Sequence, residues 1–146
     1  MAKIRLTKKF SFEMAHALIH HDGLCRNLHG HSYKLHVTIQ GTITHNGIDT
    51  EQGTMVDFAK IKQIVNDCII SKYDHALVLD EHIPVELLRS LQKQFERIIV
   101  MPCQPTVENL LSQFVQLLKN KFSQGVSLYS VLLQETENSF AEWIEE

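Results

Sequence analysis

Two stretches near the N-terminus alternate apolar and polar residues with the two-residue period of a β-strand. The first covers residues 2–16 and the second residues 29–41. In the first stretch the alternating apolar row is interrupted by Lys8, and in the second it runs from Tyr33 to Ile39. Because side chains two residues apart on a strand point to the same side, the period predicts two strands, each with one apolar face.

Apolar spacings of three and four residues follow, and they predict helices. Asp57 can cap a helix that runs to about Ser71, Pro84 suits the first turn of a shorter helix, and Thr106 is the expected N-cap of another. The side chains expected to point inward from the Pro84 helix are Leu87, Leu88, Leu91 and Phe95. Extended pieces are expected at residues 54–56, 98–101, 126–136 and 140–144, and a turn-rich loop at residues 42–53. This pattern predicts an α+β protein with a single domain over residues 1–146.

Three histidines occupy the apolar faces of the two opening strands. His16 ends the face of the first strand, and His29 and His31 share the parity of the apolar row in the second. An HxH pair alone is a weak signal, and a single strand histidine is more often a satisfied core residue. Together with the nearby Cys25 thiol, however, the set favours a metal site. Three imidazoles suit catalytic zinc with an open position, although they would accept other divalent ions.

The composition is that of an ordinary globular protein. The chain has 146 residues, of which 44% are hydrophobic and 21% charged, and its net charge of -3 gives no reason to expect nucleic-acid binding. It shows neither a signal-peptide pattern nor an apolar run long enough for a membrane span. Three cysteines without disulfide-like spacing point to a reducing cytoplasm. Cys68 is expected in the core, and Cys103 is assigned no role.

Three further polar features each allow a functional and a structural interpretation. Asp74 next to His75 could orient and activate the imidazole as an acid/base pair, or it could simply cap a turn that carries a surface histidine. Glu135 has the inward parity of its strand, where a carboxylate needs a partner, unless the strand emerges into solvent there. Glu108 is explained as a favourable acid in the first turn of a helix.

Six motifs occur in one order along nearly the whole chain. They are Phe12-Glu13-Met14-Ala15-His16, Cys25-x-x-x-His29-Gly-His31-Ser32-Tyr33, Met55-Val56-Asp57-Phe58, Tyr73-Asp74-His75-Ala76-Leu77, Pro105-Thr106-x-Glu108-Asn109 and Glu135-Thr136-Glu137. This set resembles the 6-pyruvoyltetrahydropterin synthase superfamily. The cysteine close before HGH, with no acidic residue between them, is most similar to the 6-carboxytetrahydropterin synthase branch of queuosine biosynthesis.

The resemblance implies a role for each matching position. The zinc ligands would be His16, His29 and His31. The catalytic residues would be Cys25, Asp74 and His75, and the residues near the pterin would be Glu135 as its anchor, Thr106 and Glu108. Arg26 and Lys34 lie near the zinc motif, but the sequence does not identify the triphosphate ligands.

The resemblance also implies an architecture. The family has the tunnelling fold, in which small antiparallel sheets with helices on one face join between subunits into a β-barrel. The expected assembly is a homo-oligomer, a hexamer, with active sites between subunits. Two departures stand out: Met14 replaces a common alanine, and the region from Asp80 to Met101 is longer than in compact members.

The implied reaction is a zinc-dependent lyase reaction on 7,8-dihydroneopterin triphosphate. It would give 6-carboxy-5,6,7,8-tetrahydropterin and release acetaldehyde and triphosphate. The alternatives are the pyruvoyl branch, which eliminates triphosphate and keeps all side-chain carbons, and a zinc-stabilised module that binds a pterin without turning it over.

Overall fold

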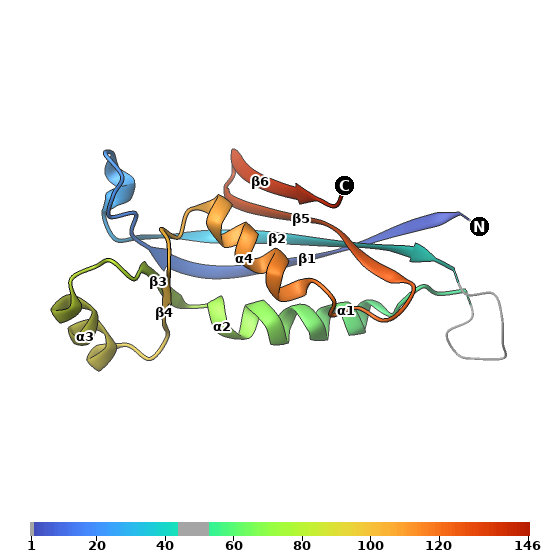
Figure 1. The fold of residues 1–146 in the computed structure, drawn as a ribbon, viewed down its shortest axis with the longest axis horizontal. Helices are drawn as coiled ribbons and strands as arrows, with labels where there is room; N and C mark the ends of the chain where they lie inside the picture. The colour runs from blue at the N-terminus through green and yellow to red at the C-terminus, as the bar shows by residue number, and fades with distance from the viewer. Residues whose placement is uncertain (1, 44–52) are drawn as a thin grey trace.

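The computed structural model describes residues 2–43 and 53–146. One mixed sheet holds six strands in the order β4-β3-β1-β2-β5-β6. The strands are β1 (Lys3–His16), β2 (His29–Thr42), β3 (Ala76–Asp80), β4 (Ile98–Met101), β5 (Val126–Thr136) and β6 (Ser139–Ile144). The helical elements are η1 (Leu24–Arg26), α1 (Phe58–Val65), η2 (Asn66–Ile70), α2 (Ser71–Tyr73), α3 (Val85–Gln94) and α4 (Val107–Leu118). Figure 1 shows α4 and the segment from α1 to α2 running along the sheet.

The two opening strands form one long antiparallel ladder, as their alternation predicts. Its register runs from Lys3 opposite Thr42 to His16 opposite His29. The apolar faces of both strands are turned toward the helices, where the Phe12 and Tyr33 rings stack with centroids 5.1 Å apart and Phe114 of α4 meets Phe12 edge-on. Burying each such side chain contributes roughly 1.5–3 kcal/mol, so this ladder fixes the strand ends that carry the histidines.

The expectation of an antiparallel sheet holds for β1, β2, β5 and β6 but not for the other edge. β3 pairs with β1 in parallel, and β4 pairs with β3 in parallel. The sequence pattern did not predict β3 at all, because the run Ala76–Asp80 is a short, almost wholly buried strand without apolar–polar alternation. The expected strand at residues 98–101 is confirmed as β4.

The first long helical segment begins where expected. The Asp57 side chain accepts a hydrogen bond from the Ala59 amide at 2.8 Å and caps α1. The segment continues to Tyr73, although residues 66–70 form a π-helix rather than an α-helix. The extended piece expected at residues 54–56 is wrong, because the chain bends there. The expected loop at residues 42–53 lies mostly outside the described residues.

Helix α3 packs differently from the prediction. Leu88 and Leu91 contact a small second cluster of buried residues at the end of the sheet, but Leu87 and Phe95 are 51% and 57% exposed. Phe95 follows the last helical residue and is extended, so it leaves the helical face on which the spacing placed it. Of the helices in the described ranges, none combines the length and apolarity that a membrane crossing requires.

Strand β5 matches its predicted bounds of residues 126–136, and β6 begins one residue before its predicted start. Two register irregularities interrupt the ladders of β5, one opposite Thr38 and Ile39 of β2 and one between Gln134 and Thr136. Such bulges redirect the side chain of the extra residue. The second irregularity lies at Glu135, one of the expected site residues.

Candidate metal centre and active site

The three histidines singled out by the sequence meet at one end of the β1–β2 ladder. Each offers one ring nitrogen, and these nitrogens all lie within 4.8 Å of one another. The ring centroids are 4.6 Å apart for His16 and His29, 4.9 Å for His29 and His31, and 5.2 Å for His16 and His31. His16 is buried, with 1% of its surface exposed. The strand register therefore brings together all three expected metal ligands.

Backbone carbonyls set the direction of two of these imidazoles. The Nδ1 atom of His16 lies 2.7 Å from the carbonyl oxygen of Pro105, and Nδ1 of His29 lies 2.7 Å from that of Asn27. Because a carbonyl oxygen only accepts hydrogen bonds, both Nδ1 atoms carry the proton and both Nε2 atoms present a lone pair. This is the arrangement of metal-binding histidines that are oriented by a second hydrogen bond.

No hydrogen-bond donor among the described residues meets the facing nitrogens. Nε2 of His16 and Nε2 of His29 are 3.1 Å apart, and the tautomers leave no proton to share between them. Nε2 of His31 is buried and has no hydrogen-bond partner among the described side chains and backbone. Buried polar atoms are normally satisfied, so two converging lone pairs and the unpartnered Nε2 of His31 fit a divalent metal ion with nitrogen preference, such as zinc.

Burial favours the neutral form of His16 and His31. It lowers the pKa of His16 below 6.5, although the Pro105 carbonyl acts in the opposite direction. Burial also lowers the pKa of His31, and the nearby Glu135 carboxylate partly offsets the effect. A neutral imidazole is the form that binds metal, so the environment favours the ligand form at neutral pH.

Glu135 points toward the histidines from the bulge of β5. Its Oε1 atom lies 3.8 Å from Nε2 of His31, and its Oε2 atom accepts a hydrogen bond from the Tyr33 hydroxyl at 3.5 Å. Burial, and the Glu135 charge in addition, raise the pKa of Tyr33 and keep its hydroxyl protonated as a donor. The inward orientation inferred from strand parity is correct, and the partners of the carboxylate come from β2 rather than from its own strand.

Asp74 and His75 form the link between α2 and β3. Oδ1 of Asp74 lies 3.0 Å from Nδ1 of His75 and accepts the amide of Glu13 at 2.9 Å. The His75 amide in turn donates to the Glu13 carbonyl at 2.6 Å. The Glu13 amide is the largest cause of a lowered pKa at Asp74, and His75 adds to it. The carboxylate is therefore ionised and in contact with the imidazole, while the His75 side chain is 75% exposed.

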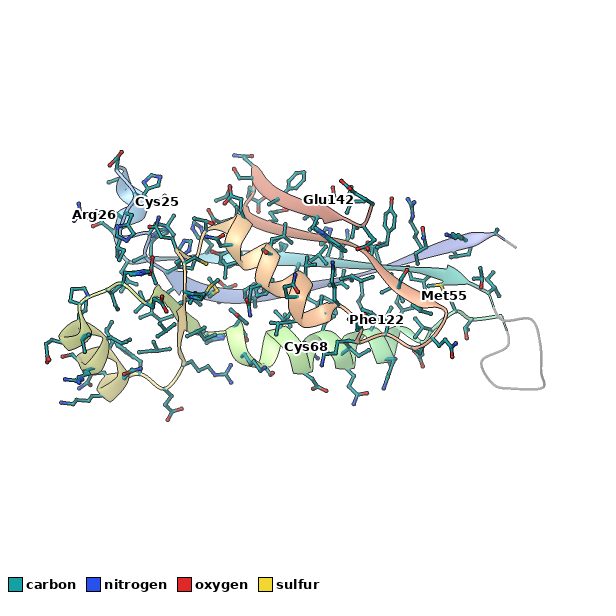
Figure 2. All side chains as sticks on the ribbon, in the orientation of Figure 1. Cys25, Arg26, Met55, Cys68, Phe122 and Glu142 are labelled. Atoms are coloured by element: carbon teal, nitrogen blue, oxygen red, sulfur yellow. The ribbon has the colours of Figure 1, made fainter. Side chains whose placement is uncertain are left out.

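Cys25 lies in η1, between β1 and β2. Figure 2 shows it on the loop at the end of the molecule where α3 also lies. Its carbonyl accepts the Leu18 amide at 3.0 Å, which closes the loop on itself. Among the described residues, no hydrogen bond or ion pair joins Cys25 to Asp74 or His75. The single chain thus assembles the histidine cluster and the Asp74–His75 pair, but not the thiol with that pair.

Neither position at the start of α4 forms a hydrogen bond or ion pair with the histidine cluster within the described residues. Thr106 caps the helix, with its Oγ1 atom accepting the Asn109 amide at 3.2 Å. Glu108 is exposed and lines a groove between α4 and β6, with Ala141 and Trp143. The contact from this region comes instead from the Pro105 carbonyl. Sequence reasoning did not identify it, because a backbone acceptor leaves no signature in residue type.

A cavity of about 820 Å³ connects two parts of the site. Its walls include His31 of the histidine cluster and His75 of the Asp74–His75 pair. Glu13 and Ser32 contribute polar atoms, and Phe95 and Arg97 come from the long segment between β3 and β4. A hollow of this volume accommodates a small organic ligand, and its walls hold both a candidate metal ligand and a candidate proton carrier.

The chain is similar in sequence and in fold to known proteins. A family model described as 6-pyruvoyl tetrahydropterin synthase matches residues 5–146. A protein of Haemophilus influenzae named 6-carboxy-5,6,7,8-tetrahydropterin synthase is 36% identical over 143 residues, which cover 97% of this chain and 99% of the relative. A protein of the same name from Aquifex aeolicus is 33% identical over 132 residues, covering 84% of this chain and 76% of the relative.

Solved structures agree with the fold. An uncharacterized protein from Wolinella succinogenes aligns with a TM-score of 0.80 at 22% identity, over 100% of both chains. The 6-pyruvoyl tetrahydropterin synthase of Caenorhabditis elegans aligns with a TM-score of 0.70 at 24% identity, over 100% of this chain and 98% of that one. On the match of the family model and the identity with these relatives, the chain belongs to the 6-pyruvoyl tetrahydropterin synthase family.

Proposed function

We propose that this protein is a zinc-dependent 6-carboxytetrahydropterin synthase of queuosine biosynthesis in the cytoplasm. It would convert 7,8-dihydroneopterin triphosphate to 6-carboxy-5,6,7,8-tetrahydropterin and release acetaldehyde and triphosphate. The observation that carries the proposal is the convergence of three imidazole nitrogens beside a cavity that also reaches His75. The relatives named for this activity, one of them 36% identical over 97% of the chain, support it further.

The residues present fit zinc, and each has a distinct part in holding it. His16, His29 and His31 would be the ligands, with the Pro105 and Asn27 carbonyls orienting the first two. When bound there, zinc supplies Lewis-acid polarisation of a substrate oxygen. Glu135 lies close enough to His31 to balance part of the added positive charge.

The remaining residues would bind the pterin and move protons. Glu135 accepts hydrogen bonds from the amino-pyrimidine edge in pairs, the geometry that a carboxylate favours. Cys25 and His75 transfer protons on opposite sides of the substrate side chain, and Asp74 holds the His75 ring by its Nδ1 atom. Thr106 and Glu108 would lie near a pterin only if the proposed oligomer brings them to the site of a neighbouring subunit.

A homo-oligomer, in the proposal a hexamer, would complete the site. His75 is 75% exposed, and no hydrogen bond or ion pair joins it to Cys25 within the described residues. A proton-transfer pair functions best in a water-excluded site. A neighbouring subunit would cover His75 and supply the missing partner. Size-exclusion chromatography with light scattering tests this, and a monomer with full turnover would contradict it.

Product analysis tests the reaction itself. Zinc-loaded protein is incubated with 7,8-dihydroneopterin triphosphate, followed by mass spectrometry of the pterin and an acetaldehyde assay. A 6-carboxy product with acetaldehyde supports the proposal. A pyruvoyl product without acetaldehyde would assign the chain to the other branch, and binding without turnover by a zinc-loaded oligomer would favour a pterin-binding module.

A further inference from the structure

Arg97 connects the long segment after β3 to the turn that carries the acid/base pair. Its Nη1 atom donates hydrogen bonds to two backbone carbonyls, those of Ser71 and Asp74, both at 2.8 Å. Its own carbonyl accepts the Leu77 amide at 2.9 Å. One residue therefore holds the chain on both sides of the Asp74–His75 turn, at the end of α2 and at the start of β3.

This turn has a conformation that needs external support. His75 has a φ of 63°, in the left-handed region that a residue with a Cβ atom rarely occupies. Such conformations persist only where the surroundings determine them by several contacts. The His75 side chain is largely exposed, so side-chain packing contributes little, and the support comes from hydrogen bonds.

These hydrogen bonds come from β1 and from Arg97, the residue that precedes β4. On the β1 side, the Glu13 amide binds the Asp74 carboxylate and the Glu13 carbonyl accepts the His75 amide. On the β4 side, the Arg97 guanidinium binds the Asp74 carbonyl, which belongs to the peptide that joins Asp74 to His75. Loss of the Arg97 contact would leave this peptide held from one side and free the carbonyls at the helix end.

We propose that Arg97 is a positioning residue: it fixes the peptide plane between Asp74 and His75 and so aims the imidazole into the cavity that Arg97 itself lines. This inference rests on the proposed function, in which Asp74 and His75 are the acid/base pair. The inference also assigns a role to the long segment from Asp80 to Met101. This segment returns to the sheet at β4 and so places the Arg97 guanidinium beside the Asp74 carbonyl. The positive charge of Arg97 adds a smaller effect, since it helps lower the pKa of Asp74.

The test compares Arg97→Met with Arg97→Lys. The methionine variant removes the donors and keeps an unbranched apolar side chain, whereas a lysine ammonium can still donate to both carbonyls. We expect kcat to fall about 10- to 100-fold in Arg97→Met, with KM and zinc content within twofold of wild type, and to recover substantially in Arg97→Lys. Arg89→Met is the matched control, because Arg89 is an exposed arginine of α3 that pairs with Glu86.

Amide hydrogen exchange provides a readout independent of turnover. The amides of residues 74–77 should exchange faster in Arg97→Met than in wild type, while those of β2 stay unchanged. Unchanged exchange at this turn, or an unchanged kcat in Arg97→Met, would overturn the inference. Asp74→Asn separates this outcome from failure of the proposed function. If Asp74→Asn loses turnover and Arg97→Met does not, only the positioning role of Arg97 is contradicted. If Asp74→Asn keeps full activity, the acid/base role of Asp74 and His75 is contradicted.

Discussion

His16 and His29 face each other with Nε2 atoms 3.1 Å apart, and each has its Nδ1 atom bound to a backbone carbonyl. The pairing register brings them opposite each other at the end of the β1–β2 ladder. Because neither nitrogen carries a proton, the contact is repulsive in the metal-free protein and becomes favourable when a cation joins the two lone pairs. Metal binding should therefore act on stability as well as on activity.

Zinc is expected to stabilise the folded chain through His31. A ligand that binds only the folded state contributes about 2.7 kcal/mol at a free concentration of 100 times its Kd, so added zinc should raise the melting temperature of chelator-treated protein. His31→Gln should weaken zinc binding by more than about 100-fold and abolish the gain. His36→Gln is the control, because His36 lies on the same strand with the opposite parity; an equal loss in both variants would contradict the site.

The stability of the metal-free protein should fall as the solution becomes mildly acidic. Burial lowers the pKa of His16 and His31 below 6.5, and burial with the nearby Lys9 charge does so for His36. The unfolded chain then binds more protons than the folded one. These histidines leave the free energy of unfolding unchanged above pH 6.5. They lower it as the pH falls from 6.5 through the lower pKa values of the folded state.

Urea unfolding in the presence of chelator, from about pH 7.5 to pH 5, measures this decline. His31→Gln should show a shallower dependence because it lacks one of the three titrating groups. A profile that is flat over this range for the wild-type protein would show that the histidines titrate alike in the folded and unfolded states.

Cys25→Ala should separate an enzyme from a binding module. If the thiol carries protons, the variant loses turnover by about 1000-fold or more while its zinc content and melting temperature stay those of wild type. Cys103→Ala provides a matched control, since Cys103 lies in the loop between β4 and α4. Loss of zinc and of stability in Cys25→Ala would instead identify the thiol as a metal ligand of a closed site.

Glu135→Gln should weaken binding of the pterin more than it slows the reaction. The amide can still accept the Tyr33 hydroxyl, but it loses the charge that strengthens paired hydrogen bonds. A hydrogen bond to a charged group contributes about 1.5–3 kcal/mol, against about 0.5–1.5 kcal/mol for a neutral one. With two such bonds weakened, KM should rise roughly 10- to 100-fold with zinc retained. Glu137→Gln, two residues further on and exposed, should behave as wild type; a similar rise in KM for both would argue against a specific anchor.

His75→Gly and His75→Ala should differ in stability although both lose turnover. At a φ of 63°, alanine meets the steric conflict that glycine avoids, so the glycine variant is expected to be more stable by about 1 kcal/mol. Urea unfolding measures the difference. Asn120, the other described non-glycine residue with positive φ, is the control site, where Asn120→Gly should leave turnover unchanged. Equal stability of the two His75 variants would show that the turn relaxes freely.

The histidine cluster was predictable because strand parity alone places side chains on one face. The two-residue period places the side chains of His16, His29 and His31 on the apolar faces of their strands. Antiparallel pairing then brings the ends of these strands together. Glu135 followed from the same argument. The carbonyls of Asn27 and Pro105 could not be found in this way, since every residue has one and only the folded chain shows which is in contact.

The parallel edge of the sheet was harder to predict. β3 is short and buried, so its residues show no alternation, and without β3 nothing indicated that Arg97 would return to the Asp74–His75 turn. The inward face of α3 was misjudged because the helix packs on a small separate cluster rather than on the main core. Within the described residues no hydrogen bond or ion pair joins Cys25 to Asp74 or His75, so the proposed role of the thiol depends on the proposed assembly.

The π-helical segment before this turn places a constraint on chain length. Residues 66–70 form a wider turn, which holds more residues than an α-helical one. Deleting one residue there would restore an ordinary α-helix and rotate all that follows by about 100°. Tyr73 would lose its edge-on contact with Phe114, whose centroid is 4.8 Å away, and Asp74 would turn from Glu13. The direction in which Asp74 and His75 point therefore depends on the number of residues in this segment. An insertion or deletion here would rotate both side chains about the helix axis, which no single substitution would do.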